Sequence, residues 1–159
     1  MKFYAHRLAL AFAVTTLLAC GGGEVPGDSQ PAPAPAAGSD LTPFQLEHGI
    51  GPITEPVTLG PVDPEMAEQG KEVFELKCSA CHKTTERYIG PELGGVTARR
   101  SPAFIMNMIL NPQEMIDRHP VTKQLLAEYM SFMANQNLTQ QEARQVLEYL
   151  RTQATGTSQ

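Results

Sequence analysis

The chain has 159 residues, three cysteines and a formal net charge of −5, with 18% charged residues. Between Asp63 and Arg151 it carries twelve acidic and ten basic residues, so this part is close to neutral. A near-neutral balance gives no indication of nucleic-acid binding, which depends on an excess of basic residues, and we expect no nucleic-acid partner.

The N-terminus has the pattern of an export signal. Lys2 and Arg7 precede an apolar stretch over residues 8–19, which has the length of a signal-peptide core and is too short for a comfortable membrane span. Residues 17–20 read Leu-Leu-Ala-Cys, which resembles the lipobox of bacterial lipoproteins. We therefore expect a signal peptide over residues 1–19 and a lipid on Cys20. An ordinary secretory signal with an incidental cysteine is the alternative.

Two segments of different character follow. Residues 20–40 are rich in glycine, proline and alanine and have few large apolar side chains, so we expect a disordered tether. Residues 41–61 have scattered apolar side chains among prolines and glycines, with no steady period. We expect an extended arm that lies against the domain, with the lone His48 solvated.

The folded domain is expected over residues 62–154, before a disordered tail at residues 155–159. Its first helix begins where Asp63 caps a proline at the first helical position, and it runs to residue 77. Glycines and prolines then break the pattern over residues 84–100.

Three further helices are expected. One begins at Ser101, whose next residue is proline, and Asn111 before another proline ends or interrupts it. A second covers about residues 121–130. The last begins with the capping box of Thr139 and Glu142 and has an apolar stripe at positions 143, 146, 147 and 150. Four helices without a strand signal predict a small all-α domain, whose core is thin without a bound group.

Directly after the first helix, residues 78–82 read Cys-Ser-Ala-Cys-His. In a helical conformation Cys78, Cys81 and His82 share one face. Two thiols there can form thioethers with the vinyl groups of a haem while the imidazole binds its iron, so the motif predicts one covalent haem c. A redox dithiol and a zinc site are the alternatives. The first requires a βαβ context and the second requires more cysteines or a second histidine pair, and the sequence has neither.

The order of these features resembles a class I cytochrome c domain and covers well over half of the chain. The shared features are a first helix with Gly70 and Phe74, the Cys-x-x-Cys-His motif, a Gly-Pro pair, a methionine-bearing loop and a last helix with Tyr149. The resemblance implies that the first and last helices cross near Gly70. It also implies that the carbonyl of Pro91 accepts a hydrogen bond from the axial histidine, His82, which fixes the imidazole.

The second axial ligand is open to several residues, and a methionine sulfur there would favour Fe(II) and raise the reduction potential. The candidates are Met106, Met108, Met115, Met130, Met133 and His119. Residues 133–139, Met-Ala-Asn-Gln-Asn-Leu-Thr, resemble the family's Met-Pro-x-x-x-Leu-Ser/Thr run, with alanine in place of proline. We therefore expect Met133 as the ligand, with Met130 and then His119 as alternatives.

Five basic residues lie near the haem motif in the sequence: Lys77, Lys83, Arg87, Arg99 and Arg100. Around an exposed haem edge they would attract an acidic partner, and otherwise they form a solvated surface.

These features favour a tethered electron carrier rather than an enzyme. It would take single electrons from a quinol-oxidising complex or another cytochrome and pass them to a terminal reductase or oxidase. The lipobox, residues 48–52 (His-Gly-Ile-Gly-Pro), 88–91 (Tyr-Ile-Gly-Pro), 99–102 (Arg-Arg-Ser-Pro), 111–112 (Asn-Pro) and 133–138 together resemble a group of small lipoprotein cytochromes c. Some of these accompany bacterial respiratory reductases, including nitrous-oxide reductase, so the resemblance implies a donor in anaerobic or microaerobic respiration without indicating which reductase. Export and lipidation predict a bacterial membrane protein that faces the periplasm, at either the inner or the outer membrane. A haem peroxidase or gas sensor with an open distal site is the alternative, and a zinc or empty Cys-x-x-Cys domain is a third.

Overall fold

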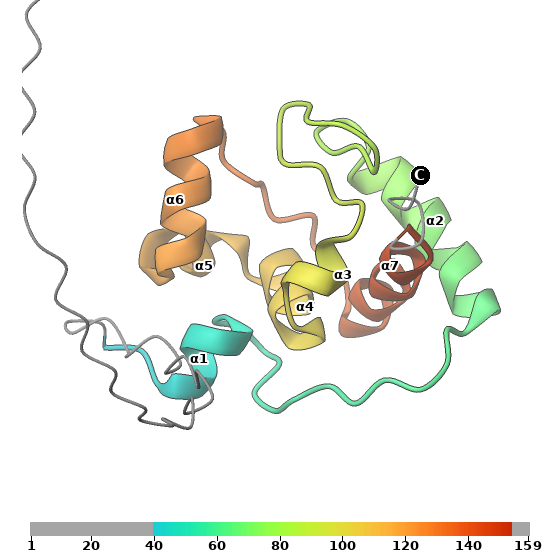
Figure 1. The fold of residues 1–159 in the computed structure, drawn as a ribbon, viewed down its shortest axis with the longest axis horizontal. Helices are drawn as coiled ribbons and strands as arrows, with labels where there is room; N and C mark the ends of the chain where they lie inside the picture. The colour runs from blue at the N-terminus through green and yellow to red at the C-terminus, as the bar shows by residue number, and fades with distance from the viewer. Residues whose placement is uncertain (1–39, 154–159) are drawn as a thin grey trace, which may run out of the picture. The chain divides into compact units, whose positions relative to one another are not determined.

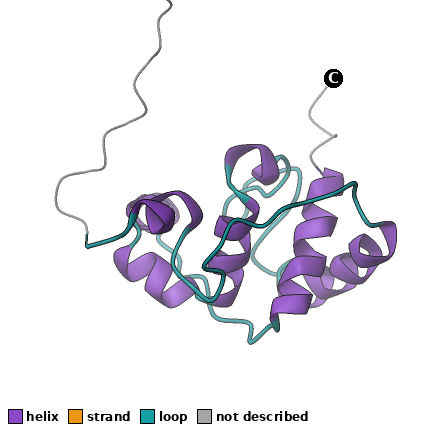
Figure 2. Cartoon of the chain, turned by 90° about the horizontal axis from the view of Figure 1, so that it is seen from below, coloured by secondary structure: helices purple, strands orange, loops and turns teal. Residues whose placement is uncertain are grey.

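The computed structural model describes residues 40–153, and proline opens five of the seven helices in this part. Proline suits the first helical position because its fixed φ matches the helix and its missing N–H has no partner to lose there. The helices are α1 (Pro43–His48), α2 (Pro64–Lys77), α3 (Val96–Arg99), α4 (Pro102–Leu110), α5 (Pro112–Arg118), α6 (Pro120–Tyr129) and α7 (Gln140–Thr152). No strand occurs among the described residues, which confirms the all-α class (Figure 1 and Figure 2).

The predicted signal peptide, Cys20, the tether up to residue 39 and the tail at 155–159 lie outside the described residues. Within residues 40–153, no helix is both long and apolar enough to cross a bilayer.

The crossing of α2 and α7 organises the core (Figure 1). Gly70 is buried at the crossing, and a Cβ placed there would collide with the backbone carbonyl of Gln145 in α7. The rings of Phe74 and Tyr149 pack one turn away, with centroids 5.2 Å apart. The buried cluster around this crossing consists of Phe74, Ile105, Met106, Ile109, Ala143, Val146, Leu147 and Leu150.

The structure has three short helices that the sequence analysis did not predict. Helix α3 has four residues and α5 has seven, which is too few for a periodic apolar pattern to emerge. The third, α1, corrects the expectation of an arm that is extended throughout. Thr42 caps α1 in a reciprocal capping box with Gln45, so residues 43–48 are helical.

Beyond α1 the arm lies against α4 and is fixed by the buried side chain of Asn107. Its Nδ2 donates to the carbonyls of His48 (3.1 Å) and Ile53 (2.9 Å), while its Oδ1 accepts from the N–H of Ile53 (2.9 Å). The sulfur of Met115, fully buried, lies 3.0 Å from the N–H of Ile50. His48 is not solvated as expected, because its Nδ1 lies 2.8 Å from the hydroxyl of Ser101.

The end of the arm is fixed by a buried carboxylate on α7. Glu148 is fully buried and pairs with Arg144 and Arg151. Arg151 also donates to the carbonyl of Gly60 at 2.6 Å, and the N–H of Asp63 lies 3.4 Å from Glu148. The pairing satisfies a charge that would be costly to bury alone.

Replacing Gly70 with alanine should lower the free energy of unfolding by about 3 kcal/mol, because the added methyl group overpacks the helix crossing. Gly60→Ala is the matched control, since a Cβ there has no neighbour within 4 Å. Chemical denaturation of both variants measures the difference. Equal stability of the two variants would contradict the close α2–α7 contact.

Candidate functional site

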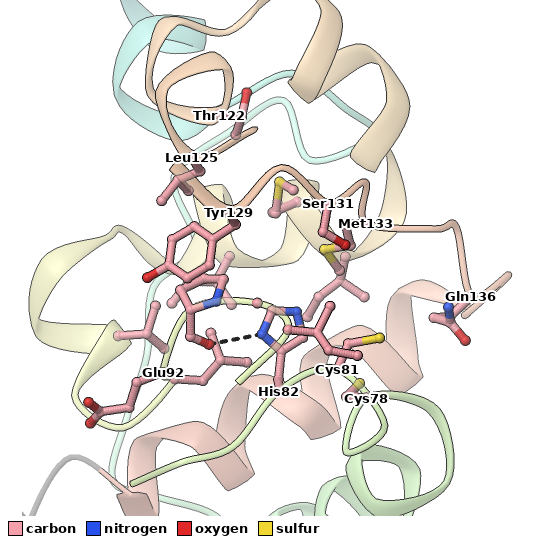
Figure 3. Close-up of a pocket in the computed structure, with 18 of the residues that line it drawn as sticks. Cys78, Cys81, His82, Glu92, Thr122, Leu125, Tyr129, Ser131, Met133 and Gln136 are labelled. Carbon is pink, nitrogen blue, oxygen red and sulfur yellow. Dashed lines mark hydrogen bonds between the residues drawn. The ribbon is translucent and has the colours of Figure 1, made fainter. Parts of the chain in front are cut away.

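A largely apolar cavity of about 290 Å³ lies between the Cys-x-x-Cys-His motif and the C-terminal half of the fold. Its lining comes from every helix except α1, together with the motif, the loop over residues 83–95 and residues 131–136. Cys78, Cys81 and His82 lie on one wall, and Met133 lies across from them (Figure 3). The structure thus brings together the two thiols, the imidazole and two of the candidate sulfur ligands, Met133 and Met108.

The motif keeps helical spacing although α2 has ended. Cys78 is the C-cap of α2, and its N–H donates to the carbonyl of Phe74 at 2.8 Å. The carbonyl of Cys78 then accepts from the N–H groups of Cys81 (3.0 Å) and His82 (2.9 Å). This extra turn directs all three side chains toward the same cavity.

Burial raises the pKa of the Cys78 thiol to about 11, and the nearby Cys81 adds to the shift. A redox-active or zinc-binding cysteine requires a thiolate, which a raised pKa disfavours. The environment of Cys78 therefore differs from that of a reactive dithiol.

His82 is held in one orientation by its neighbours. Its Nδ1 lies 3.0 Å from the carbonyl oxygen of Pro91, which can only accept, so Nδ1 carries the proton (dashed line in Figure 3). The other nitrogen, Nε2, is then unprotonated and available to bind a metal. Gly90 packs against the ring, where a Cβ would lie 2.5 Å from Cε1 of His82. The sequence signal for this contact is the glycine before Pro91.

Met133 is the predicted ligand that reaches the cavity, where it packs partly buried against the core. Met130, the alternative, ends α6 with a left-handed backbone (φ +50°), and 87% of its surface is exposed. Its side chain is outside the cavity, so the structure contradicts this alternative. The physical reason is that the left-handed turn at the helix end directs residue 130 into solvent.

The other alternative, His119, is fully buried at the start of α6 and has no free ring nitrogen. Its Nε2 donates to the carbonyl of Leu46 (3.1 Å), and its Nδ1 accepts from the N–H of Val121 (3.2 Å). Burial lowers its pKa, which keeps it neutral. His119 therefore caps α6 and holds the arm.

The remaining methionines have packing positions. Met106 belongs to the core around α2 and α7, and Met115 belongs to a second cluster with Leu41, Ile50 and Phe104. Met108 lines the cavity from within α4 and also packs against that second cluster.

The residues present fit a haem. The donor set is one imidazole nitrogen and one thioether sulfur on opposite walls, with two thiols beside the imidazole (Figure 3). Most of the remaining wall surface is apolar, as a porphyrin requires. Leu125, Leu126 and Tyr129 of α6 also lie on this wall, where a bound group would cover them.

Comparisons with known proteins agree with this geometry. The family model described as "Cytochrome c" matches residues 67–154. The curated "Cytochrome c-553-like" protein of Synechocystis sp. is 36% identical over 64 residues, which is 32% of this chain and 61% of that protein's length.

Solved structures match more of the chain. "Cytochrome c from rhodothermus marinus" is 47% identical, covers 73% of this chain and 100% of its own, and has a TM-score of 0.68. An engineered form of the Rhodothermus marinus protein, Rma TDE, is 47% identical with a TM-score of 0.66, covering 71% of this chain and 98% of its own. The same engineered protein bound to a carbene intermediate has a TM-score of 0.64, at 48% identity and the same coverage.

Methionine substitutions test the distal wall in the haem-loaded protein. We expect Met133→Ala to become high-spin in the ferric state and to lose the sulfur-to-iron charge-transfer band, because the other methionine on the cavity wall, Met108, is held within α4 and packs against the second cluster. Met130→Ala is the matched control and should retain the low-spin spectrum, since Met130 is exposed. Optical spectra of the two variants measure this. The reverse result would contradict the assignment of Met133.

Proposed function

This chain belongs to the cytochrome c family, and we propose that it is a carrier that transfers single electrons on one covalently bound haem c. The observation that carries the proposal is the cavity with His82 on one wall and Met133 on the other (Figure 3). A haem with both axial positions filled has no place for a substrate on its iron. That arrangement favours electron transfer over catalysis.

In the proposed site Cys78 and Cys81 would hold the haem through thioethers, and His82, through Nε2, and Met133 would bind its iron. When bound, the haem supplies an iron that changes between Fe(II) and Fe(III), and the neutral sulfur ligand favours Fe(II). Apolar side chains of α4 and α6 line the cavity and would surround this group. Such an apolar environment raises the energy of the extra positive charge on Fe(III).

The proximal side of the cavity, where His82 lies, should change little in structure during electron transfer. The carbonyl of Pro91 fixes the Nδ1 proton of His82, and Gly90 leaves the space that the imidazole ring occupies, where a Cβ would clash. A ligand that stays in one orientation in both oxidation states lowers the structural cost of gaining or losing an electron.

We propose the tether, partners and location on the sequence alone. The Leu-Leu-Ala-Cys run supports a lipid on Cys20, and the glycine- and proline-rich residues 20–40 would let the domain reach partners from the membrane surface. The domain would face the periplasm. Its donor would be a quinol-oxidising complex or another cytochrome. Its acceptor would be a terminal oxidase or reductase, with nitrous-oxide reductase supported only by the resemblance to lipoprotein cytochromes.

Carbon monoxide distinguishes a carrier from an open-site haem protein. We expect the spectrum of the reduced wild-type protein to stay unchanged under carbon monoxide, because Met133 occupies the distal position. Met133→Ala should bind the gas and shift its absorption. Ready binding by the wild type would favour the peroxidase or sensor alternative.

The lipid anchor is tested with the full chain in a Gram-negative host. We expect the wild type to sediment with membranes and to incorporate labelled fatty acid, because Cys20 is the predicted lipid acceptor. Cys20→Ser should release haem-loaded protein into the soluble periplasmic fraction. Equal membrane association of both proteins would argue against lipidation at Cys20.

A further inference from the structure

Helix α6 forms one wall of the cavity but buries little of its own surface in protein. Thr122 is its one buried residue, while Leu125, Leu126 and Tyr129 line the cavity. The helix packs against α5 near its N-terminus, where His119 caps it. Its C-terminal turn, which leads to Met133, therefore depends on other contacts for its position.

Arg87, in the loop over residues 83–95, makes such a contact. Its Nη2 donates to the carbonyl of Glu128 at 3.1 Å, and its Nη1 lies 3.2 Å from the carboxylate of the same residue. Its guanidinium carbon lies 4.2 Å from the ring centroid of Tyr129. The carbonyls in the last turn of a helix lack partners within the helix, so a cation there is favourable.

The two ends of this contact belong to the two sides of the cavity. Arg87 lies in the loop over residues 83–95, between His82 and Pro91, which fix the proximal side. Glu128 and Tyr129 are the last residues of α6, and only three residues separate Tyr129 from Met133. Residues 131–139 are irregular, so the end of α6 determines where this segment starts.

We propose that Arg87 is a positioning residue for the distal ligand, holding the end of α6 to the proximal loop and so keeping Met133 in the cavity. This proposal rests on the proposed function, in which Met133 binds the iron. It assigns Arg87 an intramolecular role, distinct from the docking role considered for the basic cluster near the motif.

The chemistry favours arginine over lysine at this position. The side chains of Arg87 and Glu128 are 57% and 54% exposed, so their ion pair alone contributes little. The backbone hydrogen bond and the stacking on Tyr129 remain, and both use the planar guanidinium. Lysine would keep the positive charge. It would lose the planar guanidinium, which stacks on the Tyr129 ring and donates two hydrogen bonds to Glu128 at the same time.

Imidazole binding to the ferric haem-loaded protein measures the proposed effect. Imidazole binds the iron only after Met133 leaves, so its apparent affinity reports how often the distal side opens. We expect Arg87→Ala to bind imidazole about tenfold more tightly than the wild type, which corresponds to about 1.4 kcal/mol. Arg87→Lys should lie between the two.

Arg118→Ala is the control, because Arg118 pairs with Asp40 and Glu114 away from the cavity. It should bind imidazole as the wild type does. The proposal is overturned if Arg87→Ala stays within twofold of the wild type, or if Arg118→Ala has an equal effect. Met133→Ala should bind most tightly of all. If it instead binds like the wild type, Met133 is not the ligand, and the proposed function fails together with this inference.

Discussion

An apolar cavity that the protein cannot fill with its own side chains determines the arrangement of this fold. The α2–α7 crossing is closely packed, but α6 and the loop over residues 83–95 face each other across the cavity. Covering a leucine or phenylalanine side chain contributes about 1.5–3 kcal/mol, so exposed apolar walls would be costly. A haem held by Cys78 and Cys81 would supply the missing part of the core. In the proposed function, the group that completes the fold would also carry the electron.

The two sides of the cavity are held in different ways. On the proximal side, Gly90 and Pro91 fix His82 through a close contact and a hydrogen bond within one short loop. On the distal side, Met133 lies in an irregular segment, and its position depends on α6. The arm contributes to this support, because the carbonyl of Leu46 accepts a hydrogen bond from Nε2 of His119 at the start of α6. The cavity thus has a rigid proximal side, at His82, and a distal side, at Met133, which is held by contacts between residues far apart in the sequence.

Local signals in the sequence predicted the elements whose determinants are local. Asp63 and Thr139 cap helices where the patterns indicated, and the motif spacing directed three side chains to one cavity. Helix α1 was missed, although Thr42 and Gln45 form the capping-box pattern that would have indicated it. The exclusion of Met130 depends on a left-handed backbone at a non-glycine residue, which has no sequence signal. The contact between Arg87 and α6 could not be predicted from the sequence either, because it joins residues 41 positions apart.

The central claim is that haem completes the core at α6, and native-state amide hydrogen exchange tests it most directly. The comparison is between the haem-loaded protein and unloaded Cys78→Ser/Cys81→Ser protein. The account predicts that the amides of α6 lose most of their protection without haem, while those of α2 and α7 near Gly70 remain more protected. Protection of α6 that is equal in both proteins would contradict it, because α6 would then be stable without the haem.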